Sequence, residues 1–161
     1  MTDKQIELMQ VAREYCALIE QADDNQEAIF PRILQLLPRL HRCIEAFSDE
    51  KEADCYVKDA DLDARFELFS HLRHLLGERD GYWLEYDVRT NEECKSGSLA
   101  DDLTDIYCEL KSGLLSLEEN QKKPVEAIED WRCGFKVHWG KHLVDAEKHL
   151  SELQSKNQLA K

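Results

Sequence analysis

Apolar residues recur every three or four positions along most of the chain, which is the period of an amphipathic helix. The pattern predicts helices over residues 3–22, 25–47, 62–76, 98–117 and 124–153, the last with a possible break near Gly140. Pro38 lies inside the second of these, where its missing N–H predicts a kink or a split. Residues 48–61 have no sustained period and alternate in charge, so we expect an exposed connection there.

Residues 77–88 interrupt the helical pattern with glycines and aromatic residues. Gly77 is placed to end the preceding helix, and Tyr82 and Trp83 indicate a short extended piece that packs across one end of a bundle. Ser98 is a candidate N-cap for the helix that follows. We therefore predict an all-α fold, an antiparallel bundle of five to six helices with a short aromatic-rich non-helical segment near residues 80–90.

Length and charge narrow the class of protein. A chain of 161 residues fits one domain, which we place at 1–153, with 154–161 as a frayed tail. The net charge is −13, and residues 45–109 hold 19 acidic against 7 basic residues. Such a field repels phosphate groups, so nucleic acid and anionic membrane are not expected partners. The expected partner is a protein or a small molecule, and the chain is expected to be a monomer or a homodimer.

Six cysteines lie far apart and include no CxxC pair. No run of 18 apolar residues is present, and the first residues show no signal-peptide pattern, so the sequence predicts a cytoplasmic protein. In that compartment we expect reduced thiols, several of them filling core positions, rather than disulfides or a cysteine zinc site.

The stretch over 131–153 carries the most unusual helical face. Large aromatic residues and three of the six histidines fall on one stripe of it. His138 and His142 are four residues apart, so both imidazoles can reach one point. The residue after His138 is Trp139 rather than Glu, which excludes the metalloprotease motif, and no Glu-x-x-His pair indicates a di-iron bundle site.

Three aspartates lie close together at the start of the helix over 98–117. Helical phase places Asp101 and Asp105 opposite its apolar stripe and Asp102 on the shoulder. They can stay in water and complement the helix dipole. Alternatively, Asp102 or Asp105 faces inward and pairs with Arg132 or with a histidine of the last helix, because a buried carboxylate needs such a partner.

Four motifs carry a resemblance to a known family. They are GERDGYW at 77–83, SLADDLTDIY at 98–107, LKSGL at 110–114, and WRCGF followed by HWGKH at 131–142. In this order they resemble a bacterial family catalogued as a domain of unknown function, over residues 77–146. Lys136 stands where the family pattern has an acidic residue after the Phe, which puts a carboxylate role there in doubt. The resemblance implies an all-helical bacterial protein and assigns no activity, cofactor or catalytic residue.

These observations leave three hypotheses open. The first is a non-enzymatic module without a cofactor that binds a partner or small ligand, since polar groups beside large aromatics are typical of ligand sites. Its pocket would be lined by Tyr82, Trp83, Asp102, Asp105, Arg132, His138, Trp139 and His142. The second is a hydrolase-like site for a divalent metal, with His138 and His142 as ligands and Asp105 or Asp102 as third ligand or base. The third is a polar network that only stabilises the fold.

Overall fold

The computed structural model describes residues 1–25, 28–48, 55, 61–84 and 96–159. The main helices are α1 (Asp3–Glu20), α2 (Ile29–Glu45), α3 (Leu62–Leu76), α4 (Leu99–Glu118), α5 (Pro124–Gly134) and α6 (Gly140–Ser155). A short 3-10 helix, η1 (Gly77–Arg79), follows α3, and a π turn, η2 (Phe135–Trp139), joins α5 to α6. The predicted all-α class is confirmed.

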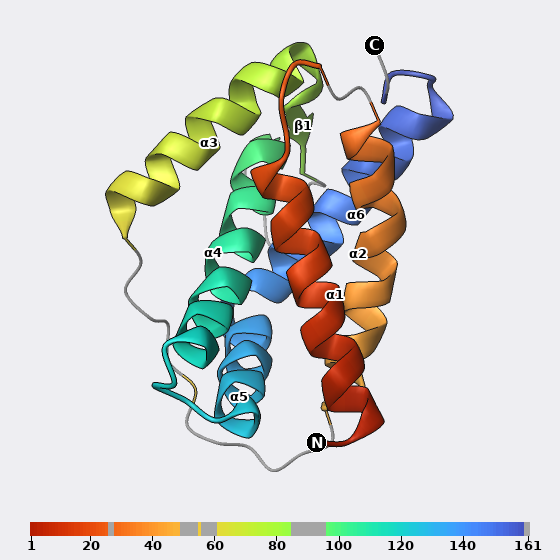
Figure 1. The fold of residues 1–161 in the computed structure, drawn as a ribbon. Helices are drawn as coiled ribbons and strands as arrows, with labels where there is room; N and C mark the ends of the chain where they lie inside the picture. The colour runs from red at the N-terminus through yellow and green to blue at the C-terminus, as the bar shows by residue number, and fades with distance from the viewer. Residues whose placement is uncertain (26–27, 49–54, 56–60, 85–95, 160–161) are drawn as a thin grey trace.

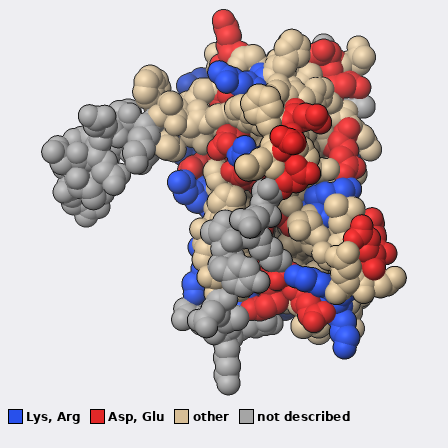
Figure 2. Space-filling view, turned by 90° about the vertical axis from the view of Figure 1, so that its left-hand side faces the viewer, with Lys and Arg blue, Asp and Glu red and all other residues tan. Residues whose placement is uncertain are grey.

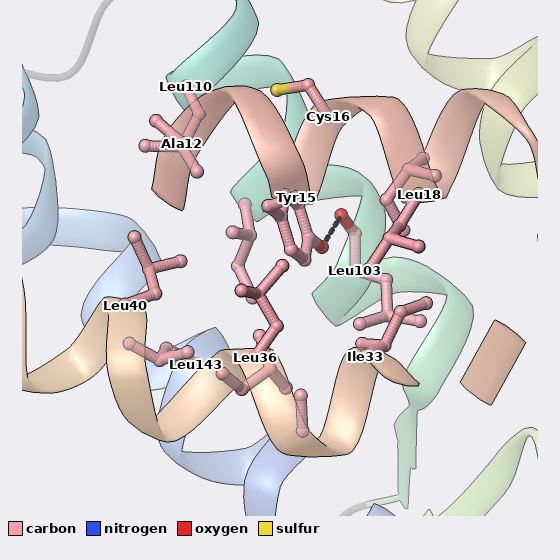
Figure 3. Packing of buried hydrophobic residues seen from close by; sticks show 14 of the residues in the cluster. Ala12, Tyr15, Cys16, Leu18, Ile33, Leu36, Leu40, Leu103, Leu110 and Leu143 are labelled. Atoms are coloured by element: carbon pink, nitrogen blue, oxygen red, sulfur yellow. Dashed lines mark hydrogen bonds between the residues drawn. The ribbon is translucent and has the colours of Figure 1, made fainter. Parts of the chain in front are cut away.

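Helix α4 lies in the middle of the molecule, where it packs against α1, α3, α5 and α6 (Figure 1). Helix α2 closes the other side by packing on α1 and α6. The core is built mainly of leucine and isoleucine side chains, and Tyr15 of α1 is buried within it. The Tyr15 hydroxyl donates to the carbonyl oxygen of Leu103 at 2.8 Å, which ties α1 to α4 and satisfies a buried polar group (Figure 3).

Two helices differ from their predicted form. Helix α2 continues through Pro38, so the predicted split is absent. Helix α3 ends at Gly77, which has φ +56° as the predicted C-cap requires. However, Leu62 and Phe66, two of the apolar residues whose spacing predicts this helix, are 74% and 66% exposed. The buried residues of α3 are Leu72, Leu75 and Leu76, so only its last turns contribute side chains to the hydrophobic core.

The aromatic segment after α3 forms half of a small antiparallel sheet. Strand β1 (Gly81–Trp83) pairs with β2 (Ser96–Ser98), and Tyr82 lies opposite Gly97. A side chain at Gly97 would clash with the Tyr82 ring, so glycine lets this ring come close to the backbone of β2. Strand β2 thus leads directly into α4. Residues 85–95 lie outside the described part of the chain.

Two of the cysteines correct the expectation of reduced thiols. Cys55 and Cys133 form a disulfide bond across 78 residues of sequence, with 5.2 Å between their Cα atoms. Cys16 and Cys43 are free and buried, as expected of small core residues, and Cys108 is free and half-buried. Cys94 falls outside the described residues. None of the described helices is long and apolar enough to pass through a membrane.

Both ends of the predicted last helix are present, but its middle is a π turn. The N–H of Gly140 donates to the carbonyl oxygen of Phe135, five residues earlier. A Cβ atom at Gly140 would clash with that same carbonyl oxygen, so the turn requires glycine there. Single π turns inside α-helices are frequent at functional sites. Here the turn holds His138 and immediately precedes α6, which holds His142.

We expect Gly140→Ala to lower the free energy of unfolding by about 1–3 kcal/mol, the usual cost of forcing an extra methyl group into a packed position. Gly81→Ala is the matched control, because a Cβ atom there meets nothing within 4 Å. Urea unfolding of both variants measures the difference. Equal stability of the two variants would contradict the role given to Gly140.

Candidate functional site

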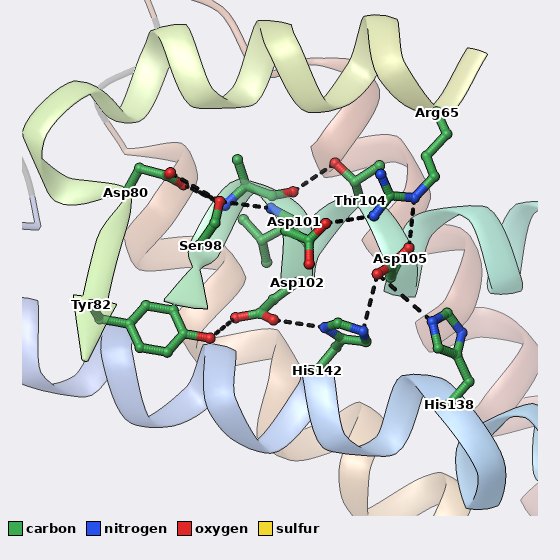
Figure 4. A network of polar contacts seen from close by, with 12 residues as sticks. Arg65, Asp80, Tyr82, Ser98, Asp101, Asp102, Thr104, Asp105, His138 and His142 are labelled. Atoms are coloured by element: carbon green, nitrogen blue, oxygen red, sulfur yellow. Dashed lines mark hydrogen bonds and ion pairs between the residues drawn. The ribbon is translucent and has the colours of Figure 1, made fainter. Parts of the chain in front are cut away.

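The start of α4 is fixed by Asp80, which is buried just before β1. Its carboxylate accepts hydrogen bonds from the N–H of Ala100 at 2.7 Å and from the hydroxyl of Ser98 at 2.9 Å. The Ser98 hydroxyl oxygen in turn accepts from the N–H of Asp101, which confirms the predicted N-cap. These bonds orient the first turns of α4 and with them the carboxylates of Asp102 and Asp105 (Figure 4).

His142 lies between two of those carboxylates. Its Nδ1 is 2.7 Å from Oδ1 of Asp102, and its Nε2 is 3.0 Å from Oδ2 of Asp105. Asp102 and Asp105 are only 3% and 7% exposed, so the interpretation that these acids stay in water is wrong for both of them. The alternative, an inward carboxylate paired with a histidine of the last helix, is confirmed.

Asp102 has a second partner from the small sheet. The Tyr82 hydroxyl donates to Oδ2 of Asp102 in a short hydrogen bond. The Tyr82 ring lies against the imidazole of His149, with 4.7 Å between ring centroids. The Nε2 atom of His149 is 2.6 Å from the carbonyl oxygen of Arg79. The sheet therefore closes one end of the polar network and holds the Asp102 carboxylate in place.

Asp105 is held from the opposite side by Arg65 of α3. The Arg65 guanidinium donates from Nε to Oδ1 of Asp105 at 2.8 Å and from Nη2 to Oδ1 of Asp101 at 2.6 Å. One oxygen of Asp105 thus binds the guanidinium while the other faces His142. Helix α3 is the layer that covers the acidic side of α4.

His138 completes the cluster from the π turn. Its Nδ1 is 3.2 Å from Oε1 of Glu109, and its Nε2 is 3.8 Å from Oδ2 of Asp105. The two imidazole rings of His138 and His142 lie edge to face, with centroids 5.1 Å apart. Both rings therefore point Nδ1 at one carboxylate and Nε2 at the shared Asp105.

The pKa values reflect this crowding of carboxylates. Burial alone would lower the pKa of His142, but the hydrogen bond to Asp102 and the charge of Asp105 outweigh it, so the pKa is raised above its ordinary value. Burial raises the pKa of Asp102 against the opposing hydrogen bonds from His142 and Tyr82. The site therefore holds more negative charge than Arg65 balances, and in the absence of another cation it favours a proton on His142.

A pocket of about 440 Å³ opens beside Asp105 and His138. It runs between the start of α3 and one face of α4, and its wall is formed by Asp61, Ala64, Asp105, Tyr107, Cys108, Glu109, Lys111, Ser112, Leu115 and His138. His142 and Asp102 are not part of this wall. The cluster is thus closed on the Tyr82 side and open on the His138 side.

Of the predicted site residues, five come together: Tyr82, Asp102, Asp105, His138 and His142 (Figure 4). Trp83 is 76% exposed, because neighbouring residues of a strand face opposite sides and Tyr82 takes the inner side. Arg132 is buried and pairs with Glu129 at 2.5 Å. Trp139 is fully buried and donates from its indole to the carbonyl oxygen of Trp131, so it belongs to the core.

The structure adds two residues that the sequence did not indicate, Arg65 and Glu109. Arg65 lies among exposed positions of α3, and nothing in its spacing connects it with Asp105, which is 40 residues away. Glu109 is four residues after Asp105 on α4, so the two side chains share a helical face. That spacing could have shown that Glu109 belongs to the cluster.

On the face that carries α3, acidic side chains are spread over the surface with basic side chains between them (Figure 2).

Comparison with known proteins yields a family and a fold. No curated protein matches the chain. Among solved structures, the crystal structure of protein BF1032 from Bacteroides fragilis is similar, with a TM-score of 0.71 and 20% sequence identity over 95% of this chain and 93% of that chain. Identity this low supports the fold alone. The model of a family described as a domain of unknown function, DUF5063, matches residues 1–156, and the chain belongs to that family.

Proposed function

We propose that Asp105, His138 and His142 bind one divalent transition-metal ion and that this metal forms the functional site of the protein. The observation that carries this proposal is the geometry of the donor atoms. One carboxylate oxygen of Asp105 and one nitrogen from each histidine lie within 4.8 Å of one another. Two imidazoles and one carboxylate suit zinc and Fe(II), and a set of three leaves a coordination position open.

The surroundings of the two histidines support a metal. A ligating imidazole usually donates its second N–H to a carboxylate, which fixes the tautomer and orients the ring. In His142 the Nδ1 atom faces Asp102, and in His138 it faces Glu109. With protons on both Nδ1 atoms, both Nε2 lone pairs are available beside Oδ2 of Asp105. A buried ion pair needs only one histidine and one carboxylate. Here two histidines each have a carboxylate at Nδ1 and face Asp105 with Nε2, as the ligands of a metal do.

The excess of negative charge around the cluster also supports a bound metal ion. Asp101, Asp102, Asp105 and Glu109 surround the cluster, and Arg65 is the cation bonded to two of them. Buried carboxylates are costly unless a cation compensates them. A divalent ion supplies that compensation at the point where Asp105 and both imidazoles meet.

A second set of donors, Asp101, Asp102 and His142, also lies within 4.8 Å. We favour the first set for two reasons. Asp101 is already bonded to Arg65, and this second set contains a single histidine. The first set alone reaches the pocket, through Asp105 and His138.

The test is metal content of the full-length protein, purified without chelator and without an affinity-nickel step. We expect about one equivalent of metal by elemental analysis, or one zinc bound per chain in a calorimetric titration of the metal-stripped protein. Cobalt substitution reports the geometry, because a tetrahedral site with two nitrogens gives an intense visible spectrum. Failure to bind any divalent transition metal stoichiometrically would refute the proposal.

The affinity for zinc should depend on pH. A proton and a metal compete for Nε2 of His142, and the raised pKa of this imidazole means that the competition begins at a higher pH than for an ordinary histidine. We expect the association constant to fall at least tenfold, roughly, for each pH unit below that pKa, because metal binding displaces at least the proton on Nε2 of His142. Titrations at several pH values measure this slope, and a flat profile between pH values of about 5 and 7 would contradict it.

The disulfide bears on where the protein works. Bonds such as Cys55–Cys133 persist mainly in oxidising compartments, so this one counts against the cytoplasmic location expected from the sequence. Alkylation of free thiols at the moment of cell lysis, followed by mass analysis, distinguishes an oxidising compartment, where the bond is formed, from the cytoplasm, where both thiols are reduced. A fully alkylated Cys133 would support the cytoplasm.

A further inference from the structure

The pocket beside the metal ligands has a consistent shape and chemistry. Its α4 wall includes Asp105, Cys108, Ser112 and Leu115, spaced three or four residues apart on one helical face. From Asp105 to Leu115 the helix rises about 15 Å, at 1.5 Å per residue. The pocket is therefore a groove that starts at two of the proposed metal ligands, Asp105 and His138, and runs along α4 away from them.

Beyond the metal end, the groove presents apolar surface. Tyr107 and Lys111 both line it, but the Tyr107 hydroxyl donates to Oε1 of Glu20 and the Lys111 ammonium is 2.7 Å from the same oxygen. With these polar ends bound to Glu20, the parts left for a ligand are an aromatic ring and an alkyl stem. Burial, followed by the charge of Asp105, raises the pKa of Cys108, so its thiol is neutral. Leu115 and Ala64 complete an apolar channel.

The charges of the groove depend on the metal. Asp105 and Glu109 lie beside His138 at its start, and Asp61 also lines the groove, so without a metal an anionic head group is repelled there. A divalent ion held by Asp105, His138 and His142 offsets the charges of Asp105 and Glu109 and offers an open position to an oxygen donor. The groove then has one end that attracts an oxygen-donor head group and a body that accepts a chain.

We propose that the groove binds a medium-chain acyl compound, whose carboxylate-like head group coordinates the metal while its chain lies along α4. This inference rests on the proposed metal site and adds the class of ligand to it. The head group would bind at the metal end of the groove, and the chain would contact the wall formed by Tyr107, Cys108 and Leu115.

The test compares two hydroxamates, acetohydroxamate and octanohydroxamate, titrated calorimetrically into the zinc-loaded full-length protein and into the zinc-free protein. A fully buried methylene strengthens binding about fourfold. Because the groove is partly open, we expect octanohydroxamate to bind about tenfold or more tightly than acetohydroxamate. We expect neither compound to bind the zinc-free protein.

Leu115→Asp places a charge at the far end of the groove, at a position 42% exposed where the fold tolerates it. It should leave acetohydroxamate binding unchanged and reduce the chain-length preference to about threefold or less. Val144→Asp is the matched control, since Val144 is 49% exposed on α6 and does not line the groove. This control should keep the full preference.

The outcomes separate the inference from the proposed function. If zinc binds with one-to-one stoichiometry but both hydroxamates bind equally well, the acyl groove is wrong and the metal site stands. If octanohydroxamate binds equally well without zinc, the role of the metal in holding the head group is wrong. If no zinc binds at all, the inference fails together with the proposed function.

Discussion

Replacement of His142 by alanine is expected to weaken zinc binding roughly 150-fold, since a site worth about 10 kcal/mol shared among three ligands loses about 3 kcal/mol with each. The effect should be large because His142 is the central group of the cluster, within 3.0 Å of both Asp102 and Asp105. Calorimetric titration of the metal-stripped variant measures it. Zinc affinity equal to that of the unmodified protein would show that His142 is not a ligand.

The control for this variant is His74→Ala, which removes an exposed imidazole of α3 and should leave zinc binding unchanged. Asp102→Asn gives a graded comparison. Asp102 orients His142 without being a ligand of the favoured set, and loss of such an orienting carboxylate costs roughly 10–100-fold in metal affinity. A metal site therefore predicts that zinc affinity is lowest in His142→Ala, intermediate in Asp102→Asn and unchanged in His74→Ala.

A purely structural network makes a different prediction for the same variants. Asp102 and His142 form a mostly buried pair, and removal of one partner from such a pair destabilises a protein by up to about 3–5 kcal/mol. The structural hypothesis therefore predicts loss of stability in both variants with no zinc binding in any of the proteins. The metal hypothesis predicts that zinc raises the unfolding temperature of the unmodified protein and raises that of His142→Ala much less.

The sequence predicted the fold better than the site because helix period is local and helix packing is not. Helical phase correctly put His138 and His142 on one face of the last helix. The same phase put Asp105 opposite the apolar stripe of α4, which predicted solvent around it. In the structure α3 covers that side and brings Arg65 to within 2.8 Å of Asp105. A helix wheel cannot show a third layer, so it could not distinguish a solvent-facing carboxylate from a buried one.

Other differences have similarly specific causes. The sequence predicts one role for Tyr82 and Trp83 because it shows an aromatic segment but no strand register. In β1 the two neighbouring side chains face opposite sides. Arg132 was a reasonable partner for Asp102 by charge alone, but it pairs with Glu129 on its own helix. Trp139 illustrates that large aromatics near polar groups more often belong to the core. Each assignment needed the neighbour in space, which the sequence does not name.

The second large effect is expected from the disulfide. Cys55 and Cys133 are 78 residues apart, and a cross-link that closes a loop of this length stabilises a fold by about 4 kcal/mol in the chain-entropy treatment, because it restricts the unfolded chain. We expect Cys133→Ser to lower the free energy of unfolding by about 2–4 kcal/mol, since measured effects often fall below the entropic value. Urea unfolding under non-oxidising, non-reducing conditions measures this difference.

Reduction of the unmodified protein provides the matched control. Dithiothreitol removes the same cross-link without a change of side chain, so it should lower the stability of the unmodified protein to that of Cys133→Ser and leave the variant unaffected. The double variant with Cys55→Ser should be no less stable than Cys133→Ser alone, because a cross-link is lost only once. If reduction leaves the stability unchanged while mass analysis shows two free thiols, the bond does not stabilise the fold.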